Sequence, residues 1–67
     1  MKAQFYLDDP VIRIFKNKSN YAILDCMFDE YNPRPKDADL VLDKCHLKRL
    51  SKWKKRDWGY ETKVQWK

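Results

Sequence analysis

The chain has 67 residues with 15 Lys/Arg and 10 Asp/Glu, a formal net charge of +5. This length allows a single small domain, residues 1–67, whose core buries only about 60% of the surface that the unfolded chain exposes. Ten aromatic side chains, one Gly and three Pro exclude a disordered tail, because the chain has ample apolar material to collapse around.

The first residues predict two short strands. Residues 2–7 (KAQFYL) read as a strand that ends before Pro10, because proline cannot donate a ladder hydrogen bond. Residues 11–15 (VIRIF) are rich in β-branched and aromatic side chains, and their alternation places Ile12 and Ile14 on one face.

The next segment has two interpretations. A polar turn at residues 17–20 followed by the apolar run 21–28 fits a β-hairpin, or a three-strand meander with the strand before it. Alternatively, residues 10–17 and 19–31 form two helices, since each segment starts with residues that favour a helix N-terminus. The β-branched VIRIF run favours the hairpin.

Two prolines within residues 32–37 predict a loop, because each proline locks φ and restricts the residue before it. From Asp43 onward the spacing predicts an amphipathic helix over residues 43–56. Its apolar stripe consists of Leu42, His46, Leu50 and Trp53.

The polar face of this predicted helix is entirely basic. Residues 44–56 contain seven Lys/Arg and no Asp or Glu. The cations on the predicted face are Lys44, Lys48, Lys52, Lys55 and Arg56, with Arg49 at its edge.

The chain closes with the clearest period-two pattern, which predicts a strand near residues 58–66. Gly59 is a suitable break between this strand and the helix. One face of the strand carries Trp58, Tyr60, Thr62, Val64 and Trp66. Rings beside cations could stack on unpaired bases, but a regular one-face pattern favours burial in the core.

These elements predict a small α+β domain: an N-terminal antiparallel β-hairpin or meander, one basic amphipathic helix, and a C-terminal β-strand. The alternative is a winged-helix-like fold with helices at 10–17 and 19–31, the basic helix as the recognition element, and residues 59–66 as the wing.

Charge is segregated along the chain. Residues 1–33 hold four Lys/Arg and five Asp/Glu, a net charge of −1, whereas residues 34–67 hold eleven and five, a net charge of +6. Such segregation is not needed for folding and indicates a polyanionic partner. We therefore expect non-enzymatic nucleic-acid binding (DNA or RNA) of low sequence specificity. The expected phosphate contacts are Lys44, Lys48, Arg49, Lys52, Lys55 and Arg56.

The alternative function is a small protein-binding regulator or inhibitor, of the kind that viruses or mobile elements encode, docking on an acidic host protein. A dipolar charge distribution and a high content of Trp, Tyr and Arg suit such an interface.

The remaining candidates predict neither an enzyme, nor a cofactor, nor a metal site. Cys26, Cys45 and His46 lack the paired spacing of a zinc site, and adjacent Cys45 and His46 would not face each other on a helix. No signal-peptide-like run and no membrane-spanning run is present in the sequence. We therefore expect a cytoplasmic protein with reduced thiols and no membrane partner.

Overall fold

The computed structural model describes residues 1–16, 21–28 and 34–67, which form six β-strands and one α-helix. This combination confirms the predicted α+β class, with strands predominating. The elements in chain order are β1 (Lys2–Tyr6), β2 (Val11–Phe15), β3 (Ala22–Met27), α1 (Pro35–Lys44), β4 (Leu47–Arg49), β5 (Lys54–Arg56) and β6 (Gly59–Trp66).

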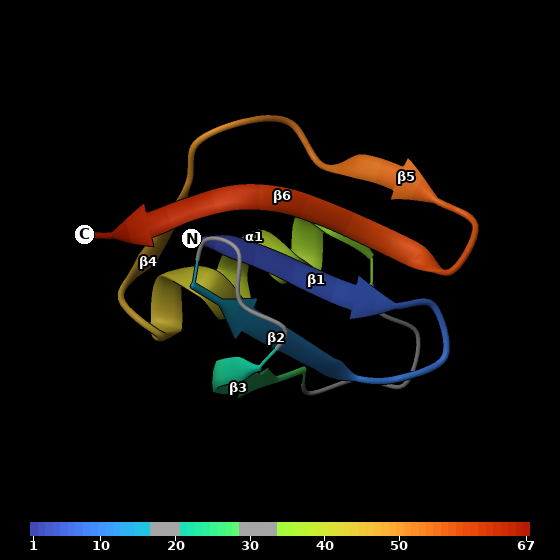
Figure 1. Ribbon diagram of the computed structural model, residues 1–67, viewed down its shortest axis with the longest axis horizontal. Helices are drawn as coiled ribbons and strands as arrows, with labels where there is room; N and C mark the ends of the chain where they lie inside the picture. The colour runs from blue at the N-terminus through green and yellow to red at the C-terminus, as the bar shows by residue number, and fades with distance from the viewer. Residues whose placement is uncertain (17–20, 29–33) are drawn as a thin grey trace.

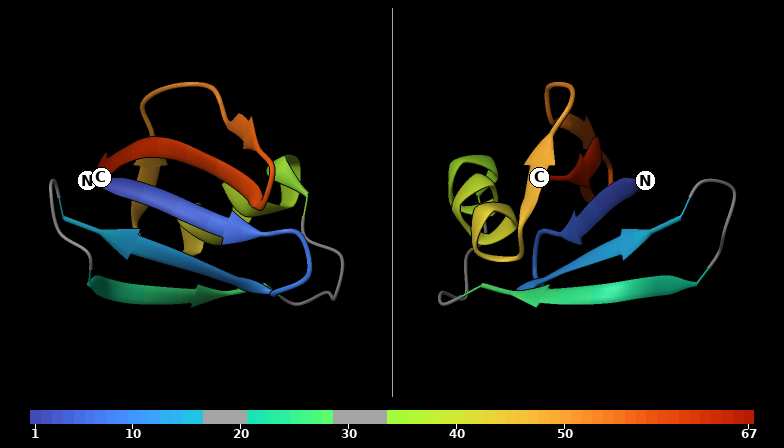
Figure 2. Two further views of the ribbon diagram at one scale, coloured as in Figure 1. Left: turned by 45° about the vertical axis from the view of Figure 1, so that its right-hand side comes forward. Right: turned by 90° about the vertical axis from the view of Figure 1, so that its left-hand side faces the viewer.

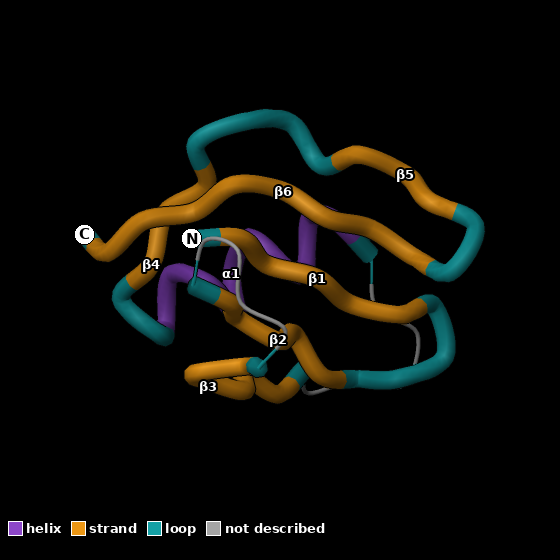
Figure 3. Tube along the Cα trace, in the orientation of Figure 1, coloured by secondary structure: helices purple, strands orange, loops and turns teal. Residues whose placement is uncertain are grey.

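The strands form one curved sheet in which every pairing is antiparallel, in the order β3-β2-β1-β6-β4 (Figure 1). The fifth strand, β5, also pairs with β6. β4 and β5 follow one another along the same edge of β6, separated by the loop of residues 50–53 (Figure 3). β6 therefore pairs with β1 along one edge and with β4 and β5 along the other.

The first three strands pair in chain order, β1 with β2 and β2 with β3. Ile12 and Ile14 of β2 share one face and are fully buried, as their alternation predicts. Strands at 11–15 and 22–27 occupy the segments that the winged-helix alternative assigns to helices, so that alternative is not supported. The predicted polar turn at 17–20 lies outside the described residues.

The helix begins inside the segment that was predicted to be a loop. Pro35 occupies the first turn of α1, where its missing N–H costs nothing because that donor would be unpaired anyway. Three side chains at helical spacing, Ala38, Val41 and Leu42, form its buried face.

The predicted basic helix at residues 43–56 is wrong. α1 ends at Lys44, and His46 adopts a positive φ of 62°, which turns the chain away from the helix axis. The segment then forms β4, a loop and β5. A helix here would place like charges at i, i+4 along its length, which is destabilising. The edge of β6 instead offers backbone hydrogen-bond partners to this segment in extended form.

The core lies between the inner face of the sheet and α1, which spans the distance between β3 and β4 (Figure 2). Phe5 of β1 is its centre: its ring packs 5.3 Å from Phe28, 5.1 Å from Trp53 and 5.3 Å from Tyr60, measured between ring centroids. The fully or nearly fully buried residues are Ala3, Phe5, Ile12, Ile14, Cys26, Phe28, Ala38, Val41, Leu42, Leu47, Thr62 and Val64.

The predicted C-terminal strand exists as β6, and its alternation holds in the middle of the strand. Thr62 and Val64 are buried and Tyr60 packs against Phe5. The pattern fails at both ends, because Trp58 lies in the turn before β6 and Trp66 is 51% exposed. The side of the sheet that α1 does not cover is called here the outer face. The side chains of β6 that alternate with Thr62 and Val64 point to this outer face.

Candidate functional site

The predicted phosphate contacts do not share one face, because the helix that would align them is absent. All six side chains are exposed, but they are distributed over four elements. Lys44 is the last residue of α1, Lys48 and Arg49 belong to β4, Lys52 lies in the loop, and Lys55 and Arg56 belong to β5.

Both arginines of this set have partners within the protein. Arg49 Nε lies 3.1 Å from Asp39 Oδ1 on α1, and Arg49 also donates to the carbonyl of Ser51. Arg56 Nε donates to Glu61 Oε1 at 2.7 Å. Arg49 thus fastens β4 to the helix, and Arg56 fastens β5 to β6.

Strand register separates the remaining cations. Lys48 is opposite Gln65, so it stands on the outer face with the polar residues of β6. Lys55 is opposite Tyr60 and therefore points to the other side of the β5–β6 pair. Lys52, in the loop between them, is exposed.

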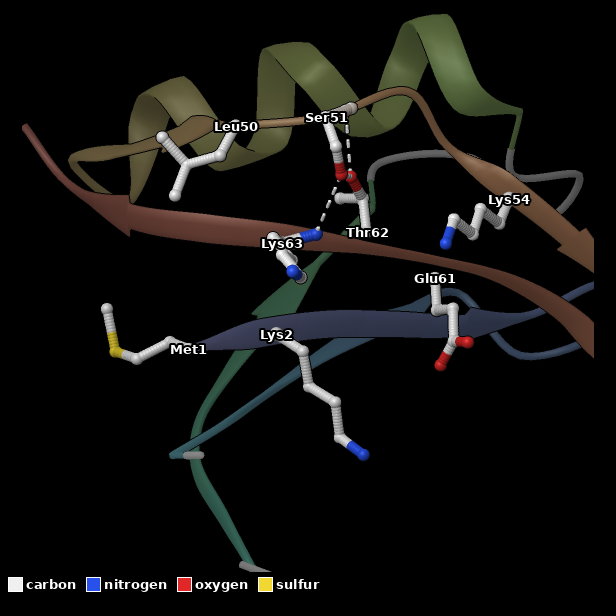
Figure 4. A pocket seen from close by; sticks show the side chains of 8 residues that line it. All are labelled: Met1, Lys2, Leu50, Ser51, Lys54, Glu61, Thr62 and Lys63. Atoms are coloured by element: carbon white, nitrogen blue, oxygen red, sulfur yellow. Dashed lines mark hydrogen bonds between the residues drawn. The ribbon is translucent and has the colours of Figure 1, made fainter. Parts of the chain in front are cut away.

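A different group of lysines gathers on the outer face around an open depression of about 680 Å³, called here the lysine depression (Figure 4). Three strands supply its cations: Lys2 comes from β1, Lys54 from β5 and Lys63 from β6. Its lining residues are Met1, Lys2, Leu50, Ser51, Lys54, Glu61, Thr62 and Lys63.

One rim of the depression is held in place by hydrogen bonds between the 50–53 loop and β6. Thr62 Oγ1 donates to the carbonyl of Ser51 at 2.8 Å, so the Ser51 hydroxyl is left to donate to Thr62 Oγ1, 3.0 Å away. The Leu50 N–H donates to the carbonyl of Lys63 at 2.8 Å. The loop is therefore a fixed wall, which positions Lys54 at its end.

Two lysines of the depression are cross-strand partners. Lys2 and Lys63 are Cα partners in the β1–β6 pair, an arrangement that is destabilising when it has no compensating anion. Within the described ranges, Lys2, Lys54 and Lys63 form no ion pair. The depression is therefore a site of accumulated positive charge open to solvent.

The carboxylate in the depression, Glu61, already has two hydrogen-bond donors within the protein. Glu61 accepts from Arg56 Nε and from Gln4 Nε2, the latter at 3.1 Å. The hydrogen bond from Arg56 is the main cause that lowers the pKa of Glu61, and Gln4 and the nearby Lys2 act in the same direction. Glu61 is oriented toward Arg56 and Gln4, and among the described residues it forms no ion pair with Lys54 or Lys63.

The sequence alone did not identify Lys2, Lys54 or Lys63 as site residues. Lys54 lies within the basic run but off the face of the predicted helix. Lys63 lies on the polar face of the predicted C-terminal strand, and Lys2 lies in the first predicted strand. The pairing of β1 with β6 brings Lys2 beside Lys63, and the pairing of β5 with β6 adds Lys54. Neither pairing can be predicted from a local sequence pattern.

The aromatic residues considered for base stacking have separate environments. Trp53 and Tyr60 pack on Phe5 in the core, and the Trp53 indole Nε1 donates to Asp39 at 2.8 Å. Trp58 instead contacts Tyr6 of β1, with ring centroids 5.3 Å apart.

Cys26 and Cys45 are free thiols. Burial, followed by a hydrogen bond with Cys45, raises the pKa of the Cys26 thiol above its ordinary value. His46 is exposed in the turn after α1. In the described part of the chain, no three residues of the metal-ligating types are grouped closely enough to hold a metal ion.

Among the described segments, no helix has the length and apolar character needed to cross a membrane. No protein-family model, curated protein or solved structure matches this chain.

Proposed function

We propose that the protein is a non-enzymatic nucleic-acid-binding protein that contacts the phosphate backbone with low sequence specificity. The observation that carries this proposal is the lysine depression, where three strands bring Lys2, Lys54 and Lys63 together. Within the described ranges, neither Lys2 nor Lys63 has an ion-pair partner. A polyanion bound here would relieve the repulsion between these two lysines.

Lysine contacts are suited to this role. An ammonium group is a compact charge on a flexible stem, so it neutralises a phosphate without reading a base edge. Backbone contacts of this kind fix the position of the nucleic acid but carry no sequence information. The proposed binding is therefore strong at low salt and similar for different sequences.

Part of the sequence-derived set extends the depression. Lys48 stands opposite Gln65, the next outer-face residue of β6 after Lys63, and Lys52 lies on the loop that forms the wall. With these two, five lysines are available. Neutralising four or five phosphates gives a slope of roughly −4 in log K against log salt on duplex DNA, or about −3 on a single strand.

The test is a salt-dependent titration of wild-type protein and of the double variant Lys2→Gln/Lys63→Gln with duplex DNA, single-stranded DNA and structured RNA. The variant should bind every nucleic acid more weakly, and its salt slope should be less steep by about 2. The matched control, Lys16→Gln/Lys36→Gln, makes the same charge change at exposed positions outside the depression.

Equal affinities for the two double variants would show that only net charge matters and would contradict the site. Absence of binding to all three nucleic acids by the wild type would contradict the function itself.

A second candidate function, docking on another protein, is favoured by β3. Within the described ranges this strand pairs with β2 alone, and its side chains Ile23 and Met27 are 43% and 62% exposed. An exposed apolar edge strand is a template for strand addition by a partner chain. Co-purification of one defined protein at high salt, lost on Ile23→Lys substitution, would support this function.

A further inference from the structure

The outer face carries aromatic rings in addition to lysines. By strand alternation, Lys2, Gln4 and Tyr6 of β1 point to this face. Phe15 of β2 stands opposite Lys2, with the Lys2 Nζ 5.7 Å from its ring centroid. The depression is therefore bordered on its β2 side by an aromatic ring.

A larger aromatic group lies at the other end of β1. The rings of Tyr6 and Trp58, called here the aromatic platform, have centroids 5.3 Å apart and planes inclined by 59°. The Arg13 guanidinium carbon lies 5.7 Å from the Tyr6 ring centroid. Tyr6 remains 41% exposed, so the platform is open to solvent although it is fixed by its neighbours.

Gly59 is the strand partner of Tyr6 and is required at this position. A Cβ there would lie 2.0 Å from the carbonyl oxygen of Phe5, so no other side chain fits without moving the backbone. Gly59 therefore permits the close approach of the β1 and β6 backbones next to the platform.

The platform and the lysine depression lie on one continuous surface. Tyr6 follows Lys2 by four residues in β1, a distance of about 13 Å along an extended strand. Gln4 and Glu61 lie between the two ends of this surface, joined by a hydrogen bond. A flexible polyanion with planar bases could therefore place phosphates at one end and a base at the other.

We propose that the nucleic acid bound by this face is single-stranded, with at least one base stacked on the Tyr6–Trp58 platform and its phosphates at Lys2, Lys54 and Lys63. This inference rests on the function proposed above. A duplex keeps its bases stacked inside, where rings that project from a sheet face cannot reach them, whereas a single strand exposes them. The combination of a cationic track with aromatic rings is the arrangement that binds single strands.

The experiment compares three labelled ligands by fluorescence anisotropy: a short oligothymidylate, an abasic oligonucleotide of the same length, and a duplex of the same length. We expect the oligothymidylate to bind at least about fivefold more tightly than the abasic strand. Tyr6→Leu should remove this advantage while leaving affinity for the abasic strand nearly unchanged. Tyr6→Phe, which retains the ring, should restore it.

The control is Tyr21→Leu, which removes a tyrosine that is 82% exposed beside β3 and is not part of the Tyr6–Trp58 platform. Thermal unfolding monitored by circular dichroism establishes that each variant is folded. If Tyr6→Leu does not fold, tryptophan fluorescence provides the same test in protein with Trp66→Phe, which retains Trp58 and the core residue Trp53. Oligothymidylate should quench the emission of this protein, the abasic strand should not, and Trp58→Phe should abolish the quenching.

The outcomes separate the two proposals. Equal affinity for the three ligands, or unchanged binding by folded Tyr6→Leu, would overturn the stacking site while leaving phosphate binding intact. Tighter binding to the duplex would also overturn it. Failure of the wild type to bind any of the ligands would instead contradict the function on which it rests.

Discussion

Lys2 and Lys63 stand directly opposite each other across the β1–β6 pair, although they lie near opposite ends of the chain. Like charges in this position reduce stability, so the fold tolerates a cost that a Gln or Thr at either position would remove. A site that concentrates charge in this way is expected where an anionic ligand supplies the missing counter-charge. The arrangement has consequences for stability as well as for binding.

Replacing Lys63 by Gln should change stability and binding in opposite directions. Removing one of the two facing charges should raise the free energy of unfolding by about 0.2–0.5 kcal/mol at low salt. The gain should shrink at high salt, where the repulsion is screened. Urea unfolding measures the first effect and nucleic-acid titration the second. Lys36→Gln on α1 is the control, and a loss of stability in Lys63→Gln would contradict the interpretation.

Glu61→Gln should strengthen nucleic-acid binding, because it removes the negative charge from the lysine depression. It should also weaken the attachment of β5 to β6, since Arg56 loses a charged acceptor. We expect a loss of roughly 0.5 kcal/mol at neutral pH, the size typical of partly exposed ion pairs.

The stability difference should depend on pH in a defined direction. The pKa of Glu61 is lowered by folding from an ordinary value of 4.5, so its contribution is present above that value and lost as the pH falls through the folded pKa. Wild type and Glu61→Gln should therefore converge in acid. A difference that widened below pH 4.5 would show that another group is responsible.

Asp39 should be the most important acidic residue of α1. It accepts from the Trp53 indole and pairs with Arg49, so it connects the helix to the loop and to β4. Asp39→Ala should lower the free energy of unfolding by about 1–2 kcal/mol, because it leaves two donors without their acceptor. The control on the same helix is Asp43→Ala: Asp43 pairs with Lys67 but both side chains are largely exposed. That change should cost less than about 0.5 kcal/mol. Equal effects of the two substitutions in urea unfolding would contradict this account.

Cys26 should be unreactive in the folded protein. Its thiol is buried and its pKa is raised above the ordinary 9.0, so very little of the reactive thiolate forms in mildly alkaline solution. Because the folded pKa is the higher one, its contribution to stability is present below pH 9.0 and is lost as the pH rises through the folded pKa. Peptide mapping after iodoacetamide treatment should find Cys26 modified no faster than the protein unfolds. Modification at the rate of a free thiol would contradict its burial.

Local patterns predicted the strands whose period-two alternation matches burial. Ile12 and Ile14 in β2, and Thr62 and Val64 in β6, face the core as their alternation indicates. The helix was misplaced for two local reasons. The two prolines within residues 32–37 predict a loop, but proline is accepted in the first turn of a helix, where Pro35 lies. The spacing of apolar residues after Asp43 suits a helix as well as a strand, a loop and a second strand.

Pairing with β6 decides whether the segment after Asp43 forms a helix or two short strands. β6 provides an edge to which β4 and β5 bind, and it turns Leu47 and Trp53 toward the core while Leu50 remains 52% exposed. The pairing of β1 with β6 explains why only part of the candidate site could be predicted. The sequence identified an excess of positive charge in its second half, but the depression also needs Lys2 from β1, which only strand register brings beside Lys63.

The most direct test of the central claim is to map the binding surface by NMR, adding a short single-stranded oligonucleotide to ¹⁵N-labelled protein. The account predicts that the largest amide shift changes fall in β1, in the segment 50–54 and in β6, with little change in α1. Changes confined to α1 and β3, or no changes at all, would contradict the assignment of the outer face as a nucleic-acid-binding surface.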